Sequence, residues 1–296
     1  MAVYRRWQWA LIGLLLILLA GSLAWQFRPV TARPALWRIS QGERHAWLFG
    51  TIHAVPAGAR WLSPAVEKAA RESDMLVLEA TGLQSEREDR AIFESLAHSQ
   101  GLPPIAARLP ATDRPRLTAL VRANPETLRN LDSYESWAAA LLIGTVSEPG
   151  LSSEEAGEAV FERQFRAKSR PVLGLETIQA QLGALDALPP ADQDALLAQA
   201  VEDAGAPSQA GQLYAHWASG DLKALEAETL GTLGHMPDLR TALFDRRNAL
   251  WAQRIDKLLR DKNNIFFIAV GAGHLLGPGS VEERLERLGW RVERVQ

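Results

Sequence analysis

Two short motifs place a histidine three residues after a glycine, and an imidazole can bind a metal or move a proton near neutral pH. One motif runs from Gly50 to His53, and the other runs from Gly271 to His274. Each follows an apolar run, and in open α/β sheets the loops beyond the carboxyl ends of the strands carry ligands. Glycine lets a backbone or a ligand approach closely. The two motifs therefore predict one active centre built from opposite ends of the chain.

Two glutamates occupy similar positions after apolar runs. Glu79 closes the run MLVLE, where a carboxylate is costly to desolvate unless it meets a metal, an arginine or hydrogen-bond donors. Glu79 is therefore the candidate catalytic acid. Glu176 closes VLGLE, but Thr177 is a good helix start, so Glu176 is also explained as an acidic residue in a first helical turn.

One arginine lies on the apolar side of an expected helix that begins near Asp238. Leu243, Leu250, Trp251 and Leu258 mark that side, and Arg247 lies four residues from both Leu243 and Trp251. A guanidinium does not lose its proton, so in the core it needs a carboxylate or a substrate anion. The structural alternative is a buried ion pair with one of the two glutamates.

The residue types at these positions suit a divalent transition metal. His53, His274 and Glu79 are the predicted ligands, and an open position would admit a nucleophilic water. Arg247 would hold a carboxylate or stabilise an oxyanion. The histidines lie far apart in sequence, so their spacing does not require a metal. A metal-free hydrolase with a histidine base and a non-enzymatic module that binds a peptide remain alternatives.

Strands and helices of one α/β domain must position these residues. Residues 36–40 and 46–53 predict a β-hairpin, and Ser63 followed by Pro64 predicts the start of a helix. The run MLVLEA predicts a buried strand that ends at Glu79, because its apolar residues are continuous.

The rest of the chain is helical in pattern until its last 30 or so residues. Residues 86–264 predict helices, interrupted by a strand at 170–176, and residues 264–295 predict a strand, a glycine-rich loop, a helix and a final strand. No linker divides the chain after residue 33. We therefore expect an α/β domain at 33–296 with a large helical insertion.

The N-terminus predicts a membrane segment. No charged residue occurs between Arg6 and Arg28, an interval that spans roughly 30 Å as a helix. We interpret residues 1–32 as an uncleaved transmembrane signal anchor and linker, with the catalytic domain on the extracytoplasmic, periplasmic side.

Composition excludes several classes of function. The net charge of -3 with interspersed signs argues against a nucleic-acid partner, and the absence of cysteine excludes disulfides and thiolate metal sites. The oligomeric state does not follow from the sequence.

Taken in order, several segments resemble the TraB/GumN family (TraB/PrgY/GumN), which is related to the Tiki metalloproteases. The resemblance covers roughly residues 36–296 and rests on LWRI, LFGTIHAVP, VLEA, LGLETIQAQL, RRNALWAQRI and IAVGAGHLLGP.

The resemblance implies an erythromycin-esterase-like mixed sheet with histidine motifs at strand ends. It implies a membrane-anchored metalloprotease that acts on a peptide or protein and depends on manganese or cobalt rather than zinc. The family's site motifs fall on Gly50, His53, Glu79, Gly271 and His274, and its helical arginine matches Arg247.

Overall fold

A computed structural model of the chain describes residues 32–81, 86–146, 150–204, 209–231, 237–261 and 264–296. Residues 33–296 form one compact unit. The expected membrane segment between Arg6 and Arg28 lies outside the described residues. Within the described ranges, no helix is both long enough and apolar enough to cross a bilayer.

The centre of the fold is a mixed sheet, which confirms the expected α/β class. Among the described residues it has six strands, in the order β6-β4-β7-β2-β1-β8. The strands are β1 (Leu36–Gln41), β2 (Arg44–Thr51), β4 (Met75–Thr81), β6 (Val172–Thr177), β7 (Phe266–Gly271) and β8 (Arg291–Arg294). Strands β6, β4, β7 and β2 run parallel, whereas β1 is antiparallel to both of its neighbours. A separate small sheet pairs β3 (Val55–Pro56) with β5 (Leu151–Ser152).

Two strands differ from their expected bounds, and β2 ends at Thr51 instead of residue 53. The predicted hairpin is present, but β2 already begins at Arg44, because Gln41 pairs with Arg44 and Gly42 takes a positive φ of 61° in the short turn. Strand β4 continues past Glu79 to Thr81, because β6 stays paired with it to that point. Glu79 therefore lies inside a strand, where the sequence placed it at a strand end.

Helices make up most of the chain between β4 and β7, and one further α-helix lies before β4 and one after β7 in the described residues. The α-helices are α2 (Pro64–Glu72), α3 (Glu86–Leu96), α4 (Arg114–Ala123), α5 (Pro125–Leu128), α6 (Ser136–Val146), α7 (Gly157–Ala167), α8 (Ile178–Asp186), α9 (Pro190–Asp203), α10 (Gln209–Ser219), α11 (Leu222–Leu230), α12 (Pro237–Arg240), α13 (Arg246–Asp261) and α14 (Val281–Arg287). Short 3₁₀ or π segments are η1 (Ile105–Arg108), η2 (Leu131–Ser133), η4 (Thr241–Asp245) and η5 (Ala272–Leu275). The start of α2 is as predicted, because the Ser63 hydroxyl accepts the N–H of Val66.

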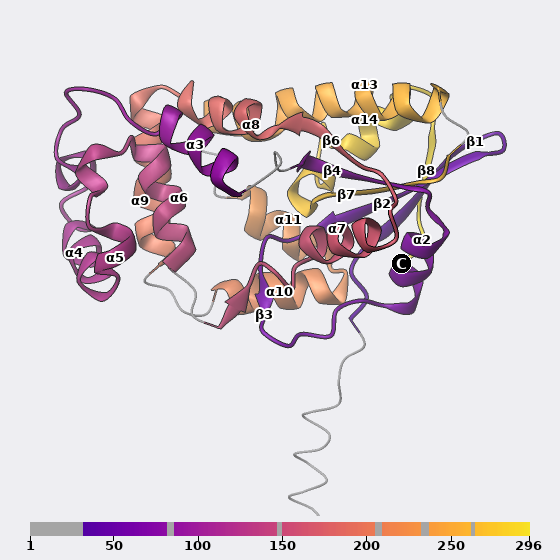
Figure 1. The fold of residues 1–296 in the computed structure, drawn as a ribbon, viewed down its shortest axis with the longest axis horizontal. Helices are drawn as coiled ribbons and strands as arrows, with labels where there is room; N and C mark the ends of the chain where they lie inside the picture. Colours follow the sequence, from indigo (N-terminus) through magenta and orange to yellow (C-terminus); the bar gives the residue numbers. More distant parts are fainter. Residues whose placement is uncertain (1–31, 82–85, 147–149, 205–208, 232–236, 262–263) are drawn as a thin grey trace, which may run out of the picture. The chain divides into compact units, whose positions relative to one another are not determined.

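Helices cover both faces of the sheet (Figure 1). Helices α13 and α14 pack on one face, and α2 and α7 pack on the other. Helices α4, α5, α6 and α9 build a second apolar core beyond one end of the strands. The sheet therefore has one end that faces a helical group, and this end can enclose a site.

The expected helix from Asp238 is present, but its buried side differs from the prediction. Leu250 is 58% exposed, whereas Trp251 and Ile255 are buried. The π-helical turn η4 inserts one wide turn before α13 and shifts the register, so a stripe drawn from Leu243 does not continue through Leu250. Arg247 is buried on the side of Trp251, as predicted.

Helix α14 carries neighbouring glutamates with opposite pH behaviour. Burial and the neighbouring Glu286 raise the pKa of Glu282 to about 7, and its Oε2 is buried without a hydrogen-bond partner among the described residues. The folded state binds this proton more tightly than the unfolded state does. The free energy of unfolding should therefore fall as the pH rises from 4.5 to 7. Glu282→Gln should raise the melting temperature at pH 8, and the gain should vanish at pH 4.

Glu283 is the matched control for that substitution. The N–H of Gly279 and the guanidinium of Arg287 lower its pKa, so its charge favours the folded state. Glu283→Gln should lower the melting temperature at pH 8 or leave it unchanged. Equal gains from both substitutions would contradict the assignment of buried charge to Glu282 alone.

Candidate functional site

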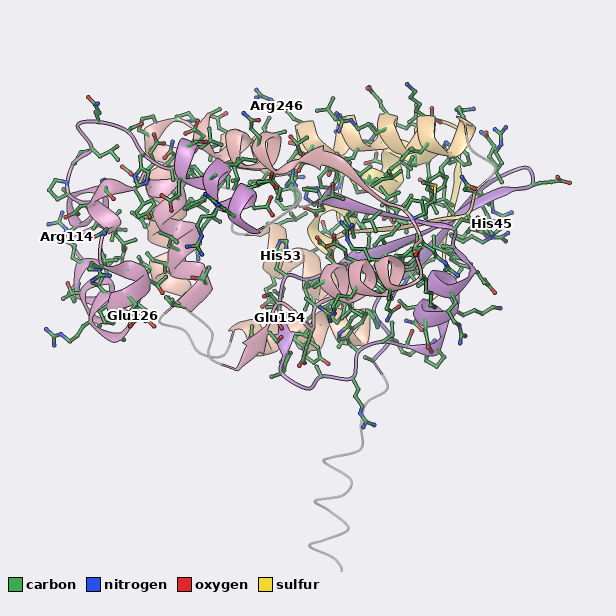
Figure 2. All side chains as sticks on the ribbon, in the orientation of Figure 1. His45, His53, Arg114, Glu126, Glu154 and Arg246 are labelled. Carbon is green, nitrogen blue, oxygen red and sulfur yellow. The ribbon has the colours of Figure 1, made fainter. Side chains whose placement is uncertain are left out.

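The carboxyl ends of the four parallel strands meet at one edge of the sheet. Thr51 at the end of β2 is in register with Gly271 at the end of β7, and β4 is held between β7 and β6. His53 follows β2 by two residues, and His274 lies in η5 directly after β7. Figure 2 shows His53 near the centre of the molecule, on the side of the sheet that faces the helical group, and His45 at the opposite end of the sheet. The topology thus brings both histidine motifs to the same edge.

A cavity of about 590 Å³ opens at this edge. Its lining includes His53, Glu79, Arg247 and His274, the four residues that the sequence singled out for chemistry. They come from the loop after β2, from β4, from α13 and from η5. Segments that are far apart in the chain therefore contribute to one enclosed space.

Arg247 is the centre of a buried ion cluster. Its Nη2 lies 3.0 Å from Oε2 of Glu79 and 2.6 Å from Oε1 of Glu176, and its Nε donates to the same Glu176 oxygen at 3.0 Å. The guanidinium also stacks 4.5 Å from the ring centre of Trp251. The sequence left a buried ion pair with either glutamate open, and the structure pairs Arg247 with both.

His274 is buried and held at both ring nitrogens. A guanidinium only donates, so Nε2 accepts from Arg247 Nη1 at 3.2 Å, which puts the ring proton on Nδ1. Nδ1 then donates to Oδ1 of Asn248 at 2.6 Å. Burial lowers the pKa of His274 to about 3. The side chain is therefore a neutral imidazole with its Nε2 lone pair on the side of Arg247.

Glu79 is buried inside β4 but remains ionised. Burial by itself would raise its pKa, yet the positive charge of Arg247 and the N–H of Gly271 help to bring the pKa below its ordinary value. Its Oε1 also accepts the N–H of Gly271 at 2.6 Å. A Cβ atom at position 271 would lie 2.9 Å from that oxygen, so any larger residue there would displace the carboxylate of Glu79.

The three predicted metal ligands line one cavity without forming a compact cluster. Nε2 of His274 lies 3.6 Å from Oε1 of Glu79, whereas His53 is exposed. Across the described part of the chain, no three histidine or carboxylate side chains stand close enough together to hold a metal ion. The neutral imidazole of His274, which Asn248 orients, and the ionised carboxylate of Glu79 are nevertheless groups of the type that bind a divalent metal.

Two residues near the site were not predicted from the sequence. Asn248 follows Arg247 directly, and its position on the same buried side of α13 was the available signal. Glu158 comes from the start of α7, and nothing in the helical pattern singled it out. Its Oε1 accepts the hydroxyl of Thr51 at 2.9 Å, and burial together with Glu79 raises its pKa to about 7.

Known proteins share parts of this sequence. The sequence model of the TraB/PrgY/gumN family matches residues 35–294. A segment is 46% identical over 56 residues to metalloprotease TIKI2 of Danio rerio, and the match covers 19% of this chain and 11% of that protein. No solved structure matches the chain significantly.

Proposed function

Because the chain belongs to the TraB/PrgY/gumN family, we propose that it is a metal-dependent hydrolase that cleaves peptides outside the cytoplasm. His53, Glu79 and His274 are its metal ligands, and the apolar N-terminal segment is its membrane tether. Manganese or cobalt is the expected metal rather than zinc. We also expect the fold to be similar to the erythromycin-esterase-like group.

The meeting of the two histidine motifs with Glu79 and Arg247 at one cavity carries this proposal. Clefts that combine a few converging polar groups with perturbed pKa values are the usual location of an active site. The short match to a metalloprotease supports the reaction class, although the matched segment is a small part of either protein.

Asn248, His274 and Glu79 have separate roles in the proposed reaction. Asn248 keeps the proton of His274 on Nδ1, so Nε2 is the ring nitrogen whose lone pair can act as a ligand or acceptor. Glu79 supplies an ionised carboxylate and a proton acceptor at Oε1. A bound divalent metal would supply Lewis-acid chemistry at the carbonyl group.

Arg247 has two roles in this proposal. Its positive charge balances two buried carboxylates, and it stands at the cavity wall, where a substrate carboxylate or an oxyanion would gain from it. In this structure Nη1 of Arg247 occupies the lone pair of His274 Nε2. Metal binding therefore requires this contact to open and His53 to approach the other two ligands.

The lining of the cavity indicates the kind of substrate. Away from the polar group the wall is largely apolar. The loop after β2 and strand β5 contribute to it, as do α8, α10 and η4, and the apolar residues are Ile52, Leu151, Leu185, Leu213, Leu243 and Phe244. A volume of about 590 Å³ lies within the usual range for small-ligand sites and exceeds one side chain. We therefore propose a short peptide segment with apolar side chains next to the scissile bond.

A peptide library and a metal measurement on the full chain test the proposal. The wild-type protein should retain manganese or cobalt and cleave peptides that carry apolar side chains near the cut. The variant His53→Ala/His274→Ala should lose both properties while it stays folded.

Other outcomes separate the alternatives. Cleavage that persists in the double variant would eliminate the assigned site. Cleavage that needs the histidines but no metal would favour a metal-free hydrolase. Binding of peptides by the wild type without turnover would favour a non-enzymatic module. Cleavage without preference for apolar side chains would contradict the proposed substrate class.

A further inference from the structure

The loop that carries His53 is held by a segment that lies about 100 residues further along the chain. This loop runs from Ile52 to Leu62, between β2 and α2. After His53, Val55 pairs with Ser152 in the small sheet. Further along the loop, the N–H of Gly58 donates to Oε2 of Glu155 at 2.6 Å. The indole of Trp61 donates to the carbonyl oxygen of Glu155 at 2.8 Å.

The same segment also holds the residue that begins the loop. Thr51 is only 1% exposed, and its hydroxyl donates to Oε1 of Glu158 at 2.9 Å. The close approach depends on Gly157, because a Cβ atom there would lie 2.9 Å from Cγ2 of Thr51. His53 therefore stands between two fixed points, two residues after Thr51 and two before Val55.

His53 depends on such support more than the other two predicted ligands do. Unlike Glu79 and His274, which are buried and bonded on several sides, His53 is exposed. Ligands and catalytic groups are effective only when neighbouring groups restrict their orientation. Residues 151–158, which we call the brace, supply that restriction through the backbone on either side of His53.

We propose that Glu158 is a positioning residue, which acts through the Thr51 hydroxyl to fix the backbone that carries His53 at the edge of the cavity. The carboxyl oxygen matters as a hydrogen-bond acceptor, so a glutamine at this position should serve nearly as well. This inference rests on the proposed function only in giving His53 a task. The contact itself can be tested without any assumption about the reaction.

Hydrogen exchange of the full chain without added metal tests the contact directly. Thr51→Val and Glu158→Ala should each speed amide exchange in residues 52–62 by about fivefold, the factor that corresponds to one ordinary hydrogen bond. Thr51→Ser and Glu158→Gln keep a donor and an acceptor, and should exchange at nearly the wild-type rate.

Glu162 provides the matched control. It lies one turn further along α7 and pairs with Arg166 at the surface, so Glu162→Ala should leave exchange in the loop unchanged. Unchanged exchange in both Thr51→Val and Glu158→Ala would overturn the proposal. Equal acceleration in Glu158→Gln and Glu158→Ala would also overturn it, because the acceptor oxygen would then be irrelevant.

Titration with Mn²⁺ alone links the brace to the site. Loss of a group that orients a ligand typically costs about 10-fold to 100-fold in metal affinity, so Thr51→Val and Glu158→Ala should weaken Mn²⁺ binding to that extent, with recovery in Thr51→Ser and Glu158→Gln. If the wild type binds no Mn²⁺, the metal assignment fails, and hydrogen exchange still decides the role of Glu158. If Thr51→Val binds Mn²⁺ as tightly as the wild type does, the positioning role is refuted.

Discussion

Replacement of Glu79 by glutamine should reduce peptide hydrolysis by about 100-fold to 10,000-fold, the range typical of a group that transfers a proton. Glutamine has nearly the same shape, so the strand should remain folded. It lacks the negative charge, and its single acceptor oxygen cannot serve both donors that Glu79 now accepts, the N–H of Gly271 and Nη2 of Arg247. Steady-state kinetics on a peptide from the library should show a lower kcat, and calorimetry should show weaker metal binding.

Glu176→Gln is the matched control for this prediction. Glu176, whose side chain is 11% exposed, is also bonded to Arg247, but it lies on the neighbouring strand, β6. Oε1 of Glu79 lies 3.6 Å from Nε2 of His274. Glu176 makes no such contact with His274 in the described part of the chain. Glu176→Gln should therefore keep most of the activity. Equal losses in the two variants would mean that the ion cluster, rather than Glu79 itself, supports the reaction.

Replacement of Arg247 by alanine should destabilise the fold by about 3–5 kcal/mol, because removal of one partner leaves buried charge without compensation. Here the uncompensated groups are Glu79 and Glu176, whose side chains are only 5% and 11% exposed. Most domains have about 5–15 kcal/mol of stability in total. Urea denaturation should therefore show a large fall in the free energy of unfolding.

Arg246→Ala controls for the loss of an arginine from the same helix. Arg246 is exposed at the surface of α13 (Figure 2), so its removal should change stability by less than about 0.5 kcal/mol. Arg247→Lys keeps the charge but not the planar fork that reaches both carboxylates, so it should fall between these two variants. A loss in Arg247→Ala no larger than that in Arg246→Ala would contradict the ion cluster.

Much of the local structure could be predicted from the sequence. The start of α2 at Pro64 and the hairpin around Gly42 rest on interactions between residues a few positions apart. Short sequence patterns therefore predict these interactions. The burial of Arg247 beside Trp251 could also be predicted, because helical periodicity fixes which side chains share a face. Leu250 was placed wrongly, since one π-helical turn changes that periodicity without a clear mark in the sequence.

The residue types of the candidate site could be identified from the sequence alone. The glycine–histidine motifs, Glu79 and Arg247 were identifiable because such groups are costly or unusual beside apolar runs. Their positions along the chain also placed them near strand ends, where ligands usually bind.

The way in which these groups combine depends on the folding of the whole domain. Parallel pairing of β2, β7, β4 and β6 brings the motifs to one edge, and this pairing joins segments more than 200 residues apart. The choice of partners for Arg247, the proton on Nδ1 of His274 and the approach of Glu158 to Thr51 all depend on three-dimensional packing. No local pattern encodes them, because each contact joins elements that the chain separates and only the folded sheet brings together.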